Sequence, residues 1–201
     1  MTYNESTLLM NVTYQDSDKN LWASFVNCSD DDALKALYQR FSDVLYAFGL
    51  RFTQDKELVK DTIHDLFLDL YKYRDSLAKD VNVKSYLFTS LKRKIYVVLK
   101  KNAAQENHIF EIPFSLSYSV EDQMINNEEQ SELLSKLDKQ LELLPSRQKE
   151  ALYLRFNSEL EYEEIAVIMN VSLETCRTLV YRGVKQLRER MVIKHLYKIL
   201  A

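Results

Sequence analysis

The chain has 201 residues, of which 46% are hydrophobic and 28% are charged, and its formal net charge is −3. This size allows one or two small domains, each with a buried core. Only two Gly and two Pro occur, so the chain is expected to be mostly helical, and no apolar run approaches the roughly 20 residues of a membrane span.

The small net charge hides an uneven distribution of charge along the chain. Residues 84–101 contain six Lys and Arg and no acid, and residues 177–194 are similarly rich in cations. Residues 121–142 contain seven Asp and Glu against two Lys. Two basic regions separated by an acidic one favour a nucleic-acid-binding function, although the net charge alone argues against it.

The sequence lacks the residue patterns of an enzyme or a metal site. It has no glycine-rich phosphate loop, no cluster of metal ligands and no nucleophile beside a base at a recognisable spacing. Cys28 and Cys176 are far apart, which fits a reducing cytoplasm, and His64 has no ligand-spaced companion. We therefore expect a cytoplasmic protein without a signal peptide, catalytic activity, metal or cofactor.

Three helices are expected in the first half of the chain, after a polar lead-in at residues 1–20. The first begins near Asp30 and ends or bends at Gly49, with apolar residues at helical spacing between them. The second covers about residues 56–77 and the third about residues 83–101. We expect one helical domain over residues 21–102.

The second of these helices has two different faces. A buried seam is predicted by spacings of four and three, and it consists of Val59, Ile63, Leu66, Leu70, Tyr73 and Leu77. Projected at about 100° per residue, the opposite face consists of Asp61, His64, Asp65 and Leu68, with Phe67 and Tyr71 to one side. A leucine among carboxylates suggests a docking site for a basic and apolar partner. A single stray exposed leucine explains the pattern equally well.

The third helix is basic on one side. Its inward residues are Leu87, Leu91, Ile95 and Val98, and its opposite side consists of Thr89, Lys92, Arg93, Tyr96 and Lys100. Cations beside an aromatic ring and a hydroxyl suit phosphate neutralisation and base stacking. A solvated lysine face explains the charge equally well, but it explains the absence of acids less well.

Residues 103–130 lose helical periodicity, contain Pro113 and several serines, and are interpreted as a flexible acidic linker. A further helix is expected over residues 131–144, where Pro145 ends it. The predicted fold is therefore all-α, with a second small helical domain at residues 131–201 that carries a helix-turn-helix.

The helix-turn-helix is predicted over residues 162–190. Ile165, Ala166 and Met169 face inward on its first helix, Asn170 tolerates a left-handed turn, and Ser172 can cap the second helix. The inward face of the second helix consists of Cys176, Val180, Val184, Leu187 and Met191. Its exposed side consists of Thr178, Arg182 and Lys185, with Thr175 and Tyr181 on the flanks. Hydroxyls and cations there suit base edges and phosphates; the alternative is a solvated face on an ordinary helical pair.

The order and spacing of these features resemble an extracytoplasmic-function (ECF, group 4) sigma factor of RNA polymerase, over about residues 21–195. Residues 58–71 (LVKDTIHDLFLDLY) are similar to the family's core-binding segment. Residues 85–94 (SYLFTSLKRK) are similar to the segment that melts and reads the minus-ten element, and residues 144–152 (LPSRQKEAL) to the run before its helix-turn-helix. Leu21, Trp22 and the many aromatic residues look most like members from the Bacteroidetes lineage.

The resemblance implies a non-catalytic transcription initiation factor that binds core RNA polymerase and directs it to promoter DNA. The polymerase clamp would contact Asp61, His64, Asp65, Phe67, Leu68 and Tyr71. The opened minus-ten element would contact Thr89, Lys92, Arg93, Tyr96 and Lys100. The minus-thirty-five element would contact Ser172, Thr175, Arg177, Thr178, Tyr181, Arg182 and Lys185. The polymerase flap and an anti-sigma factor are further implied partners, and no part is expected to insert into a membrane.

Four residues depart from the family pattern. His64 replaces a frequent glutamine, Arg93 a common asparagine of minus-ten recognition, Asn170 a common glycine of the turn, and Cys176 a common valine. Because of Arg93, the family's minus-ten preference does not carry over to this chain, whereas the changes at Asn170 and Cys176 keep the shape that the fold needs.

Two other kinds of protein fit part of the sequence. A free-standing helix-turn-helix regulator that binds operator DNA as a dimer explains residues 146–195, but it leaves the basic third helix and the acidic linker without a role. A helical adaptor without a DNA role is the other alternative. Its activity would survive loss of the charges at Arg182 and Lys185.

Overall fold

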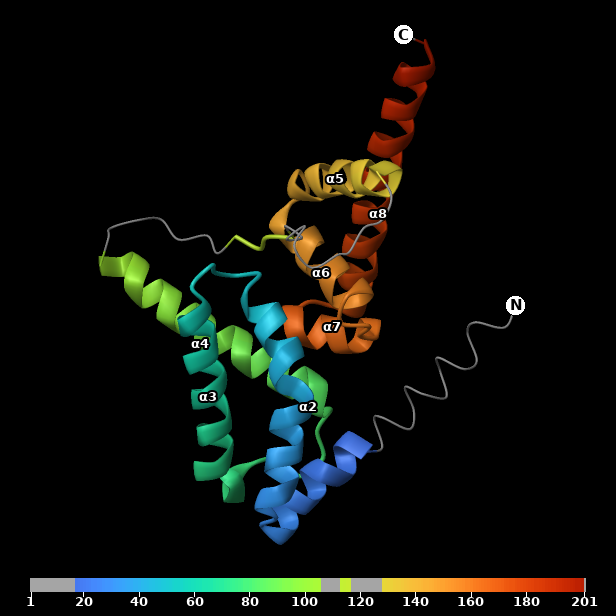
Figure 1. The fold of residues 1–201 in the computed structure, drawn as a ribbon. Helices are drawn as coiled ribbons and strands as arrows, with labels where there is room; N and C mark the ends of the chain where they lie inside the picture. Colours follow the sequence, from blue (N-terminus) through green and yellow to red (C-terminus); the bar gives the residue numbers. More distant parts are fainter. Residues whose placement is uncertain (1–16, 106–112, 117–127, 201) are drawn as a thin grey trace. The chain divides into compact units, whose positions relative to one another are not determined.

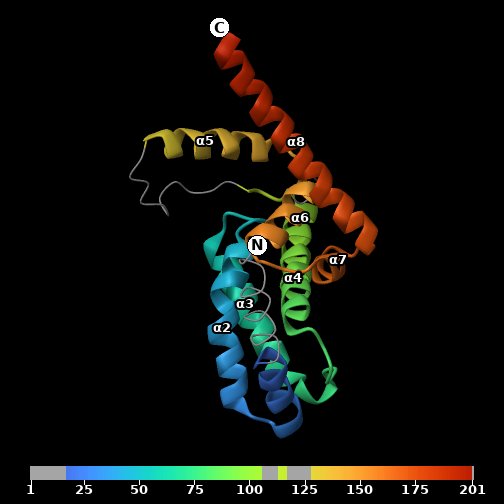
Figure 2. The ribbon, with the colours of Figure 1, turned by 90° about the vertical axis from the view of Figure 1, so that its right-hand side faces the viewer.

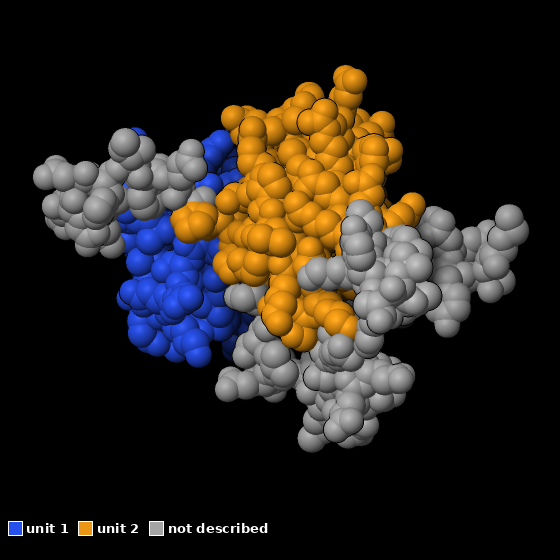
Figure 3. Space-filling view, turned by 90° about the horizontal axis from the view of Figure 1, so that it is seen from above, with its two compact units in different colours: residues 1–110 blue, residues 111–201 orange. Residues whose placement is uncertain are grey.

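The computed structural model describes residues 17–105, 113–116 and 128–200, and its regular elements within those ranges are all helices (Figure 1). The chain divides into two compact units, Met1–Phe110 and Glu111–Ala201 (Figure 3). The predicted all-α fold is confirmed, and the boundary between the units lies inside the predicted linker. No helix in the described ranges is long and apolar enough to cross a membrane.

An N-terminal helix covers residues 17–28, although the sequence predicts a polar lead-in up to residue 20. Asp18, Trp22 and Phe25 are buried on this helix at spacings of four and three. Asp18 forms an ion pair with Arg40, which explains why a carboxylate can be buried there. The remainder of the predicted lead-in, residues 1–16, lies outside the described residues.

Three longer helices complete the first unit: α2 (Asp31–Gly49), α3 (Lys56–Lys72) and α4 (Val83–Gln105). A short 3-10 helix, η1 (Arg74–Ser76), follows α3. Each of α2, α3 and α4 contacts the other two, and α4 crosses the side-by-side pair of α2 and α3 (Figure 1). Asp30 and Asp55 cap α2 and α3 by accepting backbone N–H bonds, as aspartate does at helix starts.

The predicted seam of α3 is buried only along its first part. Val59, Ile63, Leu66 and Leu70 are buried in the core of the first unit. Tyr73 is exposed and Leu77 is half-buried, because α3 ends at Lys72 and the chain leaves the helical register. The predicted extension of this helix to residue 77 is therefore wrong.

Gly49 permits the close approach of α2 to its neighbours. A Cβ atom at this position would lie 2.5 Å from Cγ1 of Val59 and 3.3 Å from Cδ1 of Ile95. Val59 is fully buried and β-branched, so it cannot turn aside easily. The glycine is needed for space, since its φ angle is not positive.

The second unit is built around α8 (Leu173–Leu200), which contacts α5 (Glu128–Glu142), α6 (Ser146–Phe156) and α7 (Tyr162–Met169). The view in Figure 2 shows α8 running past all three helices. Part of the predicted linker belongs to this unit. Phe114 and Leu116 are buried, and the Phe114 ring lies 5.7 Å from that of Tyr153. The linker residues 106–112 and 117–127 lie outside the described residues.

The Gly49→Ala substitution is expected to lower the free energy of unfolding of the first unit. Overpacking costs about 1–3 kcal/mol, whereas replacing a helical glycine by alanine gains about 1 kcal/mol, so the net loss lies in the range of roughly 0–2 kcal/mol. The 2.5 Å approach to the buried Val59 side chain places the expected loss in the upper part of this range. Trp22, the only tryptophan of the chain, can report unfolding by fluorescence in denaturant. A Gly49→Ala/Val59→Ala double variant should lose less than the sum of the single variants. A Gly49→Ala protein as stable as the wild type would contradict this packing.

The two cysteines are expected to differ in reactivity in the folded protein. Cys28 is exposed, whereas Cys176 is buried, and burial raises the pKa of the Cys176 thiol, so the reactive thiolate is scarce there. Iodoacetamide should label Cys28 in the native protein and Cys176 only after denaturation, as measured by peptide mass spectrometry. A Cys28→Ser control should take up almost no label while folded, and rapid native labelling of Cys176 would contradict the expectation.

Candidate polymerase and nucleic-acid interfaces

The exposed α3 face consists of Asp61, His64, Asp65, Leu68 and Tyr71. All five side chains are exposed, as the helical projection predicts, and Leu68 is 50% exposed. The seam on the other side of the helix is buried, so this face is available to a partner. It combines two carboxylates with apolar surface, which suits a partner that is both basic and apolar.

Phe67 does not belong to the exposed α3 face. Its side chain is 6% exposed, and its ring lies edge-on to that of Tyr38 at a centroid distance of 5.0 Å. Tyr38, on α2, is itself 40% exposed and covers the position where Phe67 is predicted to be accessible. Tyr38 was missed because it flanks the apolar stripe of its own helix, and only the packing of α2 on α3 brings it beside Phe67.

The basic side of α4 exposes Arg93, Tyr96 and Lys100, and Lys92 is half-buried. The Lys92 ammonium lies 5.7 Å from the centre of the Tyr96 ring, close enough for a cation–π contact. The same ring contacts Phe52 edge-on at 5.8 Å. Tyr96 is therefore held by neighbours on one edge while part of its ring stays accessible for stacking.

Thr89 differs from the prediction for the basic side, and Lys94, a cation of α4 outside the predicted set, is paired within the unit. The Thr89 hydroxyl is buried and has no hydrogen-bond partner among the described residues, so it is not positioned to contact DNA in this conformation. Lys94 bonds Asp69 of α3, with Nζ and Oδ2 2.5 Å apart. Its charge is therefore partly neutralised within the unit. The exposed cations of α4 are Arg93, Lys100 and Lys101.

The turn between α7 and α8 has the local geometry that the sequence predicts. Asn170 lies in the left-handed region, with φ 51° and ψ 56°. The Ser172 hydroxyl accepts the N–H of Thr175 at 3.1 Å, which caps α8. Ile165 and Cys176 are fully buried where α7 meets α8. The predicted helix-turn-helix is therefore formed.

The outer side of α8 carries the predicted DNA-binding residues. Tyr181 is 66% exposed, Arg182 and Lys185 are also exposed, and Thr178 is half-buried. Lys185 lies 3.9 Å from Glu189 one turn further along, which is a weak exposed pair. Arg182 makes no ion pair with the described part of the chain, so its guanidinium can meet a phosphate or base edge.

Three of the residues predicted to contact DNA also make contacts that hold the beginning of α8. The hydroxyls of Ser172 and Thr175 lie 2.8 Å apart. Arg177 lies 3.7 Å from Glu163 and 5.8 Å from the Tyr162 ring, both on α7. Arg177 must exchange an exposed ion pair for a phosphate to bind DNA, and such a pair costs little to break.

Arg155 is a supporting residue that the sequence analysis missed. Its guanidinium donates to the carbonyl of Leu160 at 2.8 Å, pairs with Glu161 at 3.2 Å and lies 5.0 Å from the Tyr162 ring. Glu164 in turn accepts the backbone N–H of Glu161 at 2.8 Å. These contacts set the entry into α7, and sequence periodicity could not reveal them because the partners lie in a connection.

The second unit also contains an apolar groove of about 360 Å³ between α5, α6 and α8. Its lining includes Leu116, Leu141, Leu152, Phe156 and Met191. Phe156 is exposed, so the groove has an apolar rim. Elsewhere in the described ranges, no three His, Cys, Asp or Glu side chains are grouped as metal ligands.

Each of the two units matches the model of a known protein family. The model of sigma-70 region 2 matches residues 37–105, and the model of sigma-70 region 4 matches residues 134–187. The first match contains α3 and α4 and most of α2, and the second contains α6, α7 and the first half of α8. The two matches together cover more than half of the chain.

A sequence relative agrees with the family assignment, and a solved structure shares the fold. The chain is 26% identical over 152 residues to the ECF RNA polymerase sigma factor SigM of Bacillus subtilis (strain 168), covering 76% of this chain and 91% of that protein. The fold resembles that of CnrH in complex with the cytosolic domain of CnrY, with a TM-score of 0.60, 16% identity and coverage of 89% of this chain and 99% of that one.

A second solved structure has the same fold. It is the sigma factor RpoE from Bartonella quintana in complex with the anti-sigma factor NepR, with a TM-score of 0.58 and 22% identity. The match covers 79% of this chain and 96% of that one. With region 2 in its first unit and region 4 in its second, this chain belongs to the sigma-70 family of transcription initiation factors, as a sigma factor of the ECF type.

Proposed function

We propose that this sigma factor directs core RNA polymerase to specific promoters by reading the minus-ten element with α4 and the minus-thirty-five element with α8. The observation that carries the proposal is the pair of exposed basic helix sides, one in each sigma-70 region. Arg93 and Lys100 lie on α4, and Arg182 and Lys185 lie on α8. Phosphate neutralisation by such cations supplies the sequence-independent part of DNA binding.

On α4, single-stranded bases of the opened minus-ten element stack on the accessible part of Tyr96. Its ring is supported by Phe52 and approached by Lys92, so little side-chain freedom is lost when a base stacks on it. Arg93 contacts phosphate or a base edge where family members commonly have asparagine. A charged, longer side chain at that position gives this protein its own minus-ten preference.

On α8, the exposed residues of the first half enter the major groove of the minus-thirty-five element. Tyr181 and Arg182 provide contact area and a bidentate donor, while Lys185 binds phosphate as a point charge. The Ser172 cap and the left-handed Asn170 support this assignment, because they fix the direction in which α8 leaves the turn.

The exposed α3 face docks on the clamp of core polymerase. Leu68 supplies the apolar centre of the contact, and Asp61 and Asp65 pair with cations of the partner. Phe67 is buried and contributes only indirectly, because its ring packs against Tyr38 and holds Tyr38 beside this face. The apolar groove of the second unit is proposed to receive the polymerase flap.

The other implied features follow the family pattern. The protein acts in the cytoplasm, where its polymerase is, and an anti-sigma factor holds it inactive until a signal arrives. The linker carries acidic charge along the polymerase's cationic channel. The core enzyme of a bacterium from the Bacteroidetes lineage is the first choice for tests, because the lead-in and the aromatic content of the sequence resemble that lineage.

Specific promoter binding requires the core enzyme. Each unit alone offers few phosphate contacts and binds DNA weakly at physiological salt. Polymerase holds both units at a fixed spacing, so the second contact forms at high effective concentration. Run-off transcription with core polymerase on a library of genomic promoters tests this, with new start sites expected only when the protein is added. Tight operator binding by the protein alone, without stimulation of transcription, would instead favour the free-standing regulator.

Leu68→Glu is expected to reduce core binding and run-off transcription by roughly 10-fold or more, because it buries a charge at the centre of an apolar contact. The matched control is Val44→Glu, which replaces another exposed apolar residue of the first unit. Core affinity is measured by fluorescence anisotropy with labelled protein. Equal losses in the two variants would exclude Leu68 as a specific contact.

Arg182→Ala is expected to weaken promoter binding by the holoenzyme by about 1–3 kcal/mol, the value of one good base contact. The loss should disappear on promoters whose minus-thirty-five element is already mutated. If Arg182 binds only phosphate, the loss will be uniform across promoters, and the salt slope of binding will fall by about one. Lys139→Ala, an exposed lysine of α5, is the control. Full activity of Arg182→Ala would contradict the DNA-facing assignment of α8.

A further inference from the structure

The only tryptophan of the chain ties the N-terminal helix to the connection between α3 and α4. Trp22 is 1% exposed, and its indole N–H donates to the carbonyl of Ala78 at 3.0 Å. Ala78 lies in residues 73–82, which contain only the short helix η1. A buried indole N–H needs an acceptor, so this bond links an N-terminal element to a connection 56 residues away.

The same side chain also contacts the beginning of α4. The ring of Trp22 lies 5.2 Å from that of Tyr86, which is in the first turn of this helix. Asn82 caps α4 by accepting the N–H of Ser85 at 2.9 Å. Trp22 therefore holds both the chain that leads into α4 and the first turn of α4 itself.

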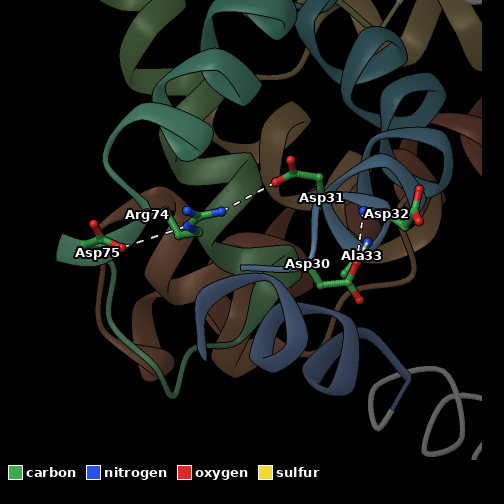
Figure 4. A network of polar contacts seen from close by, with 6 residues as sticks. All are labelled: Asp30, Asp31, Asp32, Ala33, Arg74 and Asp75. Carbon is green, nitrogen blue, oxygen red and sulfur yellow. Dashed lines mark hydrogen bonds and ion pairs between the residues drawn. The ribbon is translucent and has the colours of Figure 1, made fainter. Parts of the chain in front are cut away.

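A second set of contacts holds η1, and its ion pairs are drawn in Figure 4. The guanidinium of Arg74 points toward Asp31 at the start of α2, with an N–O distance of 3.5 Å. It also lies 6.0 Å from the ring of Phe25 on the N-terminal helix and 5.9 Å from the ring of Tyr71. The connection is thus held by the N-terminal helix and by α2 together.

We propose that the N-terminal helix is a positioning element for minus-ten recognition, with Trp22 as its positioning residue. The proposal rests on the proposed function, in which α4 reads the minus-ten element. The match to sigma-70 region 2 begins at residue 37, so the N-terminal helix precedes the part of the chain that the family model matches.

Geometry explains why a contact at the first turn matters further along α4. Tyr96 follows Tyr86 by about 15 Å along the helix axis, at 1.5 Å per residue. A tilt of about 10° at the first turn therefore displaces Tyr96 by about 2.5 Å, enough to lose a stacking contact. Movement of the connection would misplace the basic side of α4 without unfolding the unit.

The test is Trp22→Phe, which keeps an aromatic ring in the core but removes the N–H donor. Hydrogen exchange of the full-length protein is measured by mass spectrometry, and amides of residues 77–86 are expected to exchange faster than in the wild type. The matched control is Leu45→Val, a buried position of α2, compared at equal distance below the melting temperature measured by circular dichroism. The control should not speed exchange selectively in residues 77–86.

The functional readout is run-off transcription by the holoenzyme from one responsive promoter and from versions with a mutated minus-ten or minus-thirty-five element. Trp22→Phe is expected to lower discrimination between the intact and mutated minus-ten elements about 2- to 10-fold, the range for loss of one hydrogen bond. Discrimination at the minus-thirty-five element and affinity for core polymerase should stay unchanged, because the second unit and the exposed α3 face are untouched.

The outcomes separate the two proposals. Unchanged exchange in residues 77–86, or equal losses of discrimination at both promoter elements, would overturn the positioning role of Trp22. Failure of the wild-type protein to stimulate core polymerase at any promoter would overturn the proposed function. The role of Trp22 in minus-ten recognition would then be overturned as well. The exchange experiment would still report whether the contacts of Trp22 stabilise residues 77–86.

Discussion

Burial of one apolar stripe on each helix is the interaction on which both units depend. In α3 the stripe from Val59 to Leu70 is buried against α2 and α4, and in α8 the positions of Cys176 and Val180 are buried. When one face of a helix is buried in the core, the opposite face is left exposed to solvent. Leu68 and Arg182 lie on those opposite sides, so each proposed binding surface is on the reverse side of a helix face that forms the core.

Polar contacts at the helix ends help to set the directions of α4, α7 and α8, and the turn between α7 and α8 also uses a left-handed residue. Asn170 turns the chain between α7 and α8. Ser172 caps the beginning of α8, and Arg155 bonds the carbonyl of Leu160, just before α7. In the first unit, Trp22 and Arg74 hold the connection that leads into α4. Each contact is small compared with core burial, but a helix transmits a change at its end along its whole length.

The electrostatics of this protein are local. A net charge of −3 coexists with exposed cations on α4 and α8, and the exposed α3 face carries carboxylates. Charges further apart than the Debye length, about 8 Å at physiological ionic strength, are largely screened from one another. Under the proposed function, each surface presents its own charge to its own partner. DNA binding by one surface alone is then weak, and recognition depends on the polymerase that brings both units to the promoter.

Much of the fold and of the candidate interfaces could be predicted from the sequence, because helical periodicity is a property of one segment. The exposure of Leu68, the burial of Ile165 and Cys176, the left-handed Asn170 and the cap at Ser172 all depend on neighbours within a few residues. The two basic regions were likewise visible in the order of charges. The resemblance to a sigma factor rested on the same local patterns in a particular order.

Only the tertiary structure decided which side chains meet across long separations. Phe67 is buried because Tyr38 from another helix covers it, Lys94 is paired because Asp69 of α3 reaches it, and part of the predicted linker is buried in the second unit. The N-terminal helix was missed because its main partners, Arg40 and Ala78, lie far along the chain. Periodicity records how a helix repeats along itself. Packing depends on which helices come together, and that is settled only when the whole unit folds.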